Sequence, residues 1–121
     1  YGNQHKTKDG TCVRDYIHIS DLVSGHLIAL EHLVNNGNSD ICNLGYGSGY
    51  SVLEIVNRVK KLSGNNFDVK FSQTRDGDPP VLISNSKKMK ELYKWYPKYN
   101  DIDKIINSTL SWEKRVTKSE N

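Results

Sequence analysis

Several hallmarks of common protein classes are missing from this 121-residue sequence. No apolar run approaches the roughly 20 residues that a transmembrane helix needs, and the polar opening residues do not resemble a signal peptide. The two cysteines, Cys12 and Cys42, stand far apart, with no CxxC pair and no clustered histidine. This spacing fits neither a zinc pattern nor a disulfide framework, although a single bridge stays open. We therefore expect two free thiols in a reducing compartment, the cytoplasm, and predict no metal site.

Familiar catalytic motifs are also missing. The sequence has no G-x-S-x-G nucleophile elbow and no H-E-x-x-H metalloprotease helix. No tyrosine is followed four residues later by lysine, the pair suited to proton relay at a carbonyl. By spacing alone, the chain is typical of a binding portion without a reaction centre.

A large excess of positive or negative charge is missing as well. The 17 basic and 14 acidic residues give a formal net charge of +3, which is too small to indicate a nucleic-acid partner. The 36% hydrophobic content fits one small folded domain and is neither fibrous nor strongly disordered. We predict a protein that binds neither nucleic acid nor a membrane.

The order of apolar and turn-forming residues predicts alternating strands and helices. Expected strands cover 12–19, 41–44 and 67–71. Expected helices begin after Ser20 and Ser51, cover about 84–93, and begin again after Asn100 or Asp101. Ser51, with Glu54 three residues later, forms a capping-box pattern. Alternation of this kind is typical of α/β proteins.

One face of the first expected helix is apolar: it carries Val23, Leu27, Leu30 and Val34. The cluster at 35–38 should end this helix, with Gly37 as its left-handed cap, and Gly64 should end the next one. Two long amphipathic helices need a larger sheet than three short strands supply. The mismatch indicates a piece of a bigger protein.

A glycine-rich loop covers residues 45–50, after the second expected strand. A dinucleotide fingerprint reads G-x-G-x-x-G between a strand and a helix, and Gly45 and Gly47 match its first two positions. The third position is Tyr50. We therefore expect a tight structural turn here rather than a site for a cofactor pyrophosphate.

Two charged segments have the chemistry to bind a phosphorylated ligand. Arg75 and Asp78 lie in an irregular loop with Gly77 and two prolines, where a guanidinium suits phosphate oxygens and a carboxylate accepts from vicinal hydroxyls. Arg14 lies in an expected strand, where its charge needs a partner or an exit to solvent. From these residues alone, a solvated turn and a weak Arg14–Asp15 pair are the simpler interpretations.

One longer segment closely resembles a signature of UDP-glucose 4-epimerases: Gly10-Thr11-Cys12-Val13-Arg14-Asp15-Tyr16-Ile17-His18-Ile19-Ser20-Asp21-Leu22. Residues 75–79, Arg-Asp-Gly-Asp-Pro, resemble the nucleotide-binding loop of that family. The likeness extends from Tyr1 to about Arg115. Other extended short-chain dehydrogenase/reductases share the Arg-Asp-Tyr-Ile-His stretch in looser form, whereas the Gly-Thr-x-Val lead and the Arg-x-Gly-Asp loop favour the epimerase.

The resemblance implies that this chain is the C-terminal substrate-binding part of such an enzyme. Residues 1–116 would form the UDP-sugar-binding portion and 117–121 a polar tail. The Rossmann domain, with its NAD site and catalytic Tyr-x-x-x-Lys pair, would lie outside the chain. In the family, NAD takes hydride from C4 of the hexose, the 4-keto sugar turns over, and hydride returns to its other face. We therefore expect no catalytic and no cofactor-binding residue here, an inactive isolated chain, and a homodimeric full-length enzyme.

The resemblance also assigns substrate contacts by position. Arg14 and Arg75 would contact the UDP diphosphate, and Asp78 would accept from the ribose hydroxyls. Tyr1 falls where the family has an aromatic residue whose backbone meets uracil. Leu82 falls where the family borders the sugar, and it is neither the large aromatic nor the small residue found there. The expected substrates are UDP-glucose and UDP-galactose.

Two alternatives stay open. The chain could come from another nucleotide-sugar enzyme of the same superfamily, such as a dehydratase or a decarboxylase. It could instead be a non-catalytic module that binds a phosphorylated ligand or a partner protein.

Overall fold

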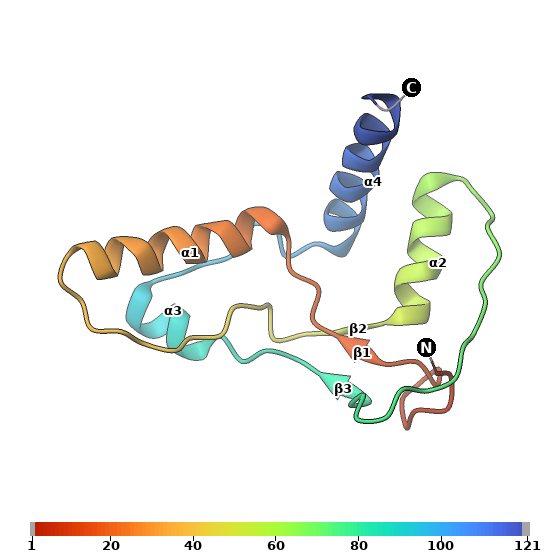
Figure 1. Ribbon diagram of the computed structural model, residues 1–121, viewed down its shortest axis with the longest axis horizontal. Helices are drawn as coiled ribbons and strands as arrows, with labels where there is room; N and C mark the ends of the chain where they lie inside the picture. The colour runs from red at the N-terminus through yellow and green to blue at the C-terminus, as the bar shows by residue number, and fades with distance from the viewer. Residues whose placement is uncertain (1, 120–121) are drawn as a thin grey trace. The chain divides into compact units, whose positions relative to one another are not determined.

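The computed structural model describes residues 2–119, and its contacts divide the chain into two compact units. The sheet unit comprises Tyr1–Arg14, Tyr50–Leu82 and Asp101–Asn121. The helical unit comprises Asp15–Gly49 and Ile83–Asn100. Figure 1 labels the helices and strands of both, and each unit is described by itself.

The sheet unit is built on three two-residue strands in the order β2-β1-β3. They are β1 (Val13–Arg14), β2 (Tyr50–Ser51) and β3 (Val81–Leu82). The central strand β1 pairs antiparallel with β2 and parallel with β3, so that Leu82 lies opposite Arg14. The parallel pairing brings the chain just before β3 alongside β1, where the backbone N–H of Val13 donates to the carbonyl of Pro80 at 2.8 Å.

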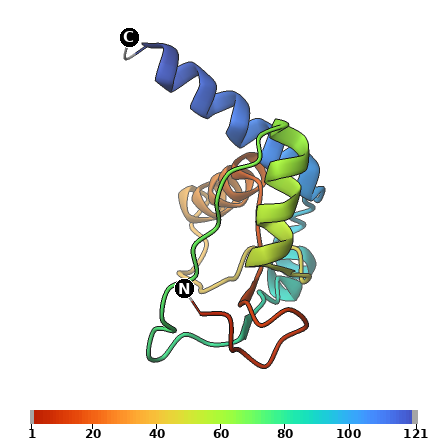
Figure 2. The same cartoon turned by 90° about the vertical axis from the view of Figure 1, so that its right-hand side faces the viewer.

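Two helices complete this unit. The capping box of α2 (Val52–Ser63) is confirmed, because the Glu54 N–H donates to Ser51 Oγ at 3.1 Å and the Ser51 N–H donates to Glu54 Oε2 at 2.8 Å. Gly64 ends α2 in the left-handed region, as expected, at φ 72°. The second helix, α4 (Ile102–Ser119), begins beside α2, with its Ile102 and Ile106 side chains buried (Figure 2).

A turn around Asp9 fixes the approach to β1. The carboxylate of Asp9 accepts from the N–H of Thr11 at 2.9 Å and from its hydroxyl at 2.7 Å, and Ser51 Oγ also donates to it. Burial alone would raise the pKa of Asp9, but the hydrogen bonds from Ser51 and Thr11 outweigh it and hold the pKa below its usual value. Thr11 Oγ1 in turn accepts from the N–H of Leu53 at 3.1 Å. These bonds tie the segment before β1 to the start of α2.

The helical unit contains α1 (Ile19–Val34) and α3 (Lys87–Tyr93), which contact each other. Its centre is the carboxylate of Asp21, which is 2% exposed. This carboxylate accepts from the Tyr46 hydroxyl at 2.7 Å and from the N–H groups of Lys98 at 2.8 Å and Tyr99 at 2.9 Å. Burial favours a higher pKa for Asp21, but these donors outweigh it and lower the pKa. The Trp95 indole, 1% exposed, donates to the Asp21 carbonyl at 3.2 Å.

One face of α1 remains exposed, as the imbalance between helices and sheet predicted. Its large apolar side chains are between 47% and 72% exposed: Ile19, Val23, Leu27, Leu30, Leu33 and Val34. At about 25 cal/mol per Å² of apolar surface, an uncovered row of this size is a substantial loss of hydrophobic stabilisation. None of the helices within 2–119 combines the length and apolarity that a bilayer crossing requires.

Two of the three expected strands are wrong. Residues 41–44 are irregular, and the Ile41 N–H donates to the Asp40 side chain at 2.7 Å instead of to a neighbouring strand. Residues 67–71 are also irregular, with Phe67, Val69 and Phe71 each at least 37% exposed. The first expected strand shrinks from 12–19 to Val13–Arg14. Alternating residues form a strand only where a partner strand supplies hydrogen bonds.

Both expected ends of α1 also shift. His18, not Ser20, is the N-cap, because its Nδ1 accepts from the Ser20 N–H at 3.1 Å. At the other end Asn36, not Gly37, takes the left-handed conformation, at φ 61°. Asparagine tolerates that region. The other helical ends fit the prediction better: Asp101 caps α4, accepting from the N–H groups of Asp103 and Lys104, although α4 continues past Val116 to Ser119.

Candidate functional site

Arg14 and Asp78 meet inside the sheet unit, although they are 64 positions apart in sequence. Arg14 Nη2 donates to Asp78 Oδ1 in an ion pair. Its Nη1 donates to the carbonyls of Pro79 and Val13, each at 2.8 Å. The Arg14 side chain is 24% exposed and that of Asp78 is 18% exposed, so the pair is largely shielded from water. The pairing of β1 with β3 produces this meeting.

Arg75 approaches the same carboxylate from within its own turn. The Asp78 N–H donates to the Arg75 carbonyl at 3.3 Å, and Gly77 adopts φ 77°, a value that a side chain would disfavour. Arg75 Nη2 lies 3.8 Å from Asp78 Oδ2, with 63% of its side chain exposed. The irregular loop predicted around Arg75, Gly77 and Asp78 is therefore confirmed, and its charged residues converge with Arg14.

Two guanidinium groups facing one carboxylate leave an excess of one positive charge. Arginine presents planar, charged donors that match phosphate oxygens, so the cluster has the right sign and donor set for a diphosphate. The carboxylate is already engaged, because Arg14 holds Oδ1 while Arg75 and Cys12 Sγ, at 3.7 Å, face Oδ2. A ligand hydroxyl that binds Asp78 must therefore share or displace one of these partners.

The other residues assigned to substrate binding lie as follows. Leu82 follows this cluster on β3, directly opposite Arg14 in the sheet, and is 60% exposed. Tyr1 lies outside the described residues. Thus Arg14, Arg75 and Asp78 come together, Leu82 borders them through the strand pairing, and the assignment of Tyr1 stays a prediction.

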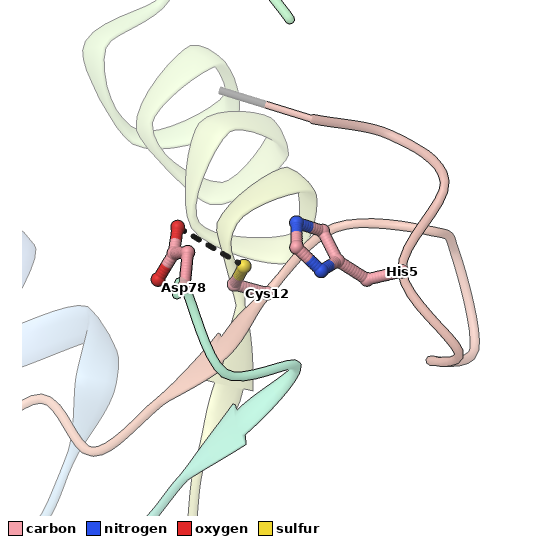
Figure 3. Close-up of side chains that lie close together, drawn as sticks. All are labelled: His5, Cys12 and Asp78. Atoms are coloured by element: carbon pink, nitrogen blue, oxygen red, sulfur yellow. Dashed lines mark hydrogen bonds between the residues drawn. The ribbon is translucent and has the colours of Figure 1, made fainter. Parts of the chain in front are cut away.

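The structure adds two neighbours that sequence reasoning did not connect with the site. The side chains of His5 and Cys12 lie next to Asp78 (Figure 3). Cys12 and Cys42 are both free thiols, as predicted. Nothing in the spacing of His5, Cys12 and Asp78 signals their proximity, because it depends on the fold of the loop before β1 and on the β1–β3 pairing.

The glycine-rich loop does not fit a dinucleotide cofactor. A Cβ at Gly45 would lie 2.5 Å from both the Asp15 carboxylate and Ser84 Cβ, so this glycine allows close internal packing. The Asp15 carboxylate also accepts from the N–H groups of Tyr46 and Gly47, each at 3.3 Å. Amides that a pyrophosphate would need are thus occupied by a carboxylate, which agrees with the predicted structural turn.

Comparison with known proteins gives consistent matches. A family model for the NAD dependent epimerase/dehydratase family matches residues 3–45. A UDP-glucose 4-epimerase of Azospirillum brasilense is 43% identical over 119 residues, which is 98% of this chain and 34% of that protein. Another, from Lacticaseibacillus casei, is 42% identical over 93% of this chain and 34% of its own length. The chain therefore spans about a third of the curated relatives it matches.

Solved structures agree with these matches. A crystal structure of a UDP-glucose 4-epimerase superposes with a TM-score of 0.87 at 41% identity, covering 95% of this chain and 35% of that one. The UDP-Glc/GlcNAc 4-epimerase of Campylobacter jejuni gives a TM-score of 0.81 at 46% identity, again over 95% of this chain and 35% of its own. A UDP-glucose 4-epimerase of Bifidobacterium longum, in complex with NAD+ and UDP, gives 0.82 at 33% identity over 95% and 34%.

Proposed function

We propose that this chain, which is homologous to UDP-glucose 4-epimerases over nearly its whole length, is the C-terminal, UDP-binding part of such an enzyme. The observation that carries the proposal is the convergence of Arg14, Arg75 and Asp78 from two distant segments. This convergence supports the roles that the resemblance assigns, the diphosphate to the two arginines and the ribose to Asp78. The proposed substrates are UDP-glucose and UDP-galactose.

The proposed role of the cluster is to hold the part of the substrate that does not react. Arg14 and Arg75 bind the diphosphate with charge-assisted hydrogen bonds, and this relieves Arg14 of part of its pairing with Asp78. The freed carboxylate oxygen then accepts from ribose hydroxyls. Binding energy gained at the nucleotide is available to orient the hexose, whose turning in the site requires that the nucleotide stay fixed.

Leu82 is proposed to border the sugar. It follows the cluster along β3 and its side chain is 60% exposed, so a hexose extending from the diphosphate past Arg14 would meet it. An aliphatic side chain offers the sugar a smooth apolar wall without a hydrogen bond that would fix one orientation. This wall suits a substrate that presents either face of its ring. Tyr1 is proposed to meet uracil through its backbone.

The chemical step is proposed to occur in a part of the enzyme that this chain does not supply. Hydride transfer, its NAD site and the catalytic tyrosine are proposed to lie in the remainder of the enzyme, since the resemblance assigns them there and this chain spans about a third of its relatives. The 121 residues alone are then inactive. The complete enzyme is proposed to be a homodimer in the cytoplasm.

The test is turnover by the full-length protein that contains this chain. With NAD present, it should convert UDP-galactose to UDP-glucose, and UDP should compete with the substrate far better than dTDP or GDP. Competition mainly by dTDP or GDP would indicate a different nucleotide-sugar enzyme. Nucleotide binding without any conversion of the sugar would indicate a non-catalytic module.

A further inference from the structure

A nitrogen, a sulfur and an oxygen ligand gather beside β1. One imidazole nitrogen of His5, Sγ of Cys12 and a carboxylate oxygen of Asp78 all lie within 4.8 Å of one another (Figure 3). Within residues 2–119 this is the one group of three such side chains close enough to share a metal ion. Cys12 is buried, at 4% exposed, whereas His5 and Asp78 are half-buried.

Backbone hydrogen bonds hold all three residues in place. The His5 N–H donates to the carbonyl of Gly10 at 2.9 Å, which closes the loop before β1. The Cys12 carbonyl accepts from the N–H of Val52, the first residue of α2, at 3.0 Å. Asp78 is fixed by its turn and by the ion pair with Arg14. Preformed ligand positions reduce the entropy that a metal ion must overcome on binding.

The imidazole of His5 supplies an independent sign of an unmet interaction. Its Nε2 is buried and has no hydrogen-bond partner among the described residues. Buried polar atoms are nearly always paired, so an unpaired one needs an explanation, such as a role as a metal ligand. The thiol of Cys12 donates to the Asp78 carboxylate at a sulfur–oxygen distance of 3.7 Å.

We propose that His5, Cys12 and Asp78 form a binding site for a thiophilic divalent cation of the Zn²⁺ type. Imidazole nitrogen, thiolate sulfur and carboxylate oxygen are the three donor types that zinc accepts, and a water molecule would complete a tetrahedron. The thiol gives up its proton to solvent when the cation binds. Sulfur ligation selects against Mg²⁺ and Ca²⁺, which prefer oxygen.

To bind one cation, the three side chains must move slightly closer together. Bond lengths of about 2.0–2.3 Å place tetrahedral ligands about 3.3–3.8 Å apart, so the side chains must approach by roughly 1 Å. Rotation about side-chain bonds supplies that movement without moving β1. Arg14 holds Oδ1 of Asp78, so the cation would bind Oδ2, the oxygen that faces Cys12, and would displace Arg75, whose Nη2 lies 3.8 Å from it. The two nearby guanidinium groups repel a cation and keep the site weaker than a structural zinc site.

A consequence follows for nucleotide binding, and it rests on the proposed function. The same Asp78 carboxylate is assigned to the ribose of UDP. Two vicinal ribose hydroxyls need both carboxylate oxygens, the one that Arg14 releases as well as Oδ2, so a cation on Oδ2 would take an acceptor that the ribose needs. Cation and UDP should therefore exclude each other, which makes the site inhibitory.

The test is a Co²⁺ titration of the full-length protein, because Co²⁺ substitutes for Zn²⁺ and absorbs strongly in visible light when tetrahedral. The variants are Cys12→Ser and His5→Asn, and the matched control is Cys42→Ser, which removes the other thiol. We expect wild type and Cys42→Ser to show the same saturable absorption. Cys12→Ser and His5→Asn should weaken Co²⁺ binding by roughly tenfold or more, at least the loss seen when supporting groups of a metal site are removed.

The outcomes of this titration distinguish failure of the metal site from failure of the proposed function. Absence of the tetrahedral absorption, or an unchanged titration in Cys12→Ser, would overturn the proposed metal site and leave the proposed function intact. Loss of the signal on adding UDP would support both the site and the role of Asp78. Full Co²⁺ binding with UDP bound would keep the metal site and contradict the assignment of Asp78 to the nucleotide.

Discussion

Replacing Asp21 by alanine tests the hydrogen-bond network that organises the helical unit. The Asp21 carboxylate accepts from the Tyr46 hydroxyl and from the N–H groups of Lys98 and Tyr99, at 2.7, 2.8 and 2.9 Å. With alanine, three donors lose a charged acceptor at a site that is 2% exposed. The two amides belong to the segment that follows Trp95, so this segment should loosen first.

The magnitude follows from these three bonds. An unsatisfied buried donor costs about 1–3 kcal/mol. Lys98 and Tyr99 are exposed residues, so water can reach their amides in the variant and the lower end of that range applies. We therefore expect Asp21→Ala to reduce the free energy of opening of the helical unit by about 3–4 kcal/mol. This loss is a large fraction of the roughly 5–15 kcal/mol that stabilises an ordinary protein.

Native-state hydrogen exchange of the full-length protein measures this loss locally. Peptides that cover residues 94–100 should exchange several hundred-fold faster in Asp21→Ala, as about 3–4 kcal/mol requires. Peptides from α2 should change little. The matched control is Asp40→Ala, which removes a carboxylate of the same unit that lies on its surface. Equal exchange in wild type and Asp21→Ala, or equal effects of the two variants, would refute the central role of this carboxylate.

Three further predictions concern pH, capping and the exposed helix face. Folding lowers the pKa of Asp21, so the stabilisation that its carboxylate gives the folded state is fully present above the usual value of 3.8 and is lost as the pH falls through the folded-state pKa. The difference in hydrogen-exchange rate between wild type and Asp21→Asn should therefore shrink on acidification from pH 6 to pH 3. Ser51→Ala removes the N-cap of α2 and a hydrogen bond to Asp9, so the free energy of unfolding, measured by urea denaturation, should fall by about 1–2 kcal/mol. An unchanged urea midpoint would contradict the capping role of Ser51. Because the apolar face of α1 is exposed, the isolated chain should melt without a sharp transition and bind a hydrophobic dye. The double variant Leu27→Glu, Leu30→Glu should bind less dye. Cooperative melting together with epimerase activity of the isolated chain would contradict this prediction.

Features that depend on neighbouring residues could be predicted from the sequence. The capping box of Ser51 and Glu54 was predictable because both partners lie within one helical turn. Gly64 and Gly77 take positive φ where the sequence placed an end or a turn. The apolar row of α1 was also recognisable, because helical spacing alone defines it.

Features that depend on distant partners could not be predicted in the same way. The strands expected at 41–44 and 67–71 have suitable residues but no partner strand, whereas β2 and β3 have two residues each, too few for any alternation. The ion pair of Arg14 with Asp78 spans 64 positions, and only the family resemblance suggested that these residues act together. Nothing in the sequence placed His5 beside Cys12, because a loop brings them together.

The most direct test of the central claim is the UDP affinity of Arg75→Ala in the full-length protein, measured by calorimetry beside Arg58→Ala. Arg58 is the matched control, because it pairs with Asp103 at 2.6 Å instead of with the Asp78 cluster. Arg75 is 63% exposed, so its removal should not disturb folding. A charge-assisted contact is worth about 1.5–3 kcal/mol, so we expect UDP affinity to fall roughly 10–150-fold, with uridine affinity and Arg58→Ala almost unchanged. Equal UDP affinity in wild type and Arg75→Ala would contradict the claim that this cluster binds the diphosphate.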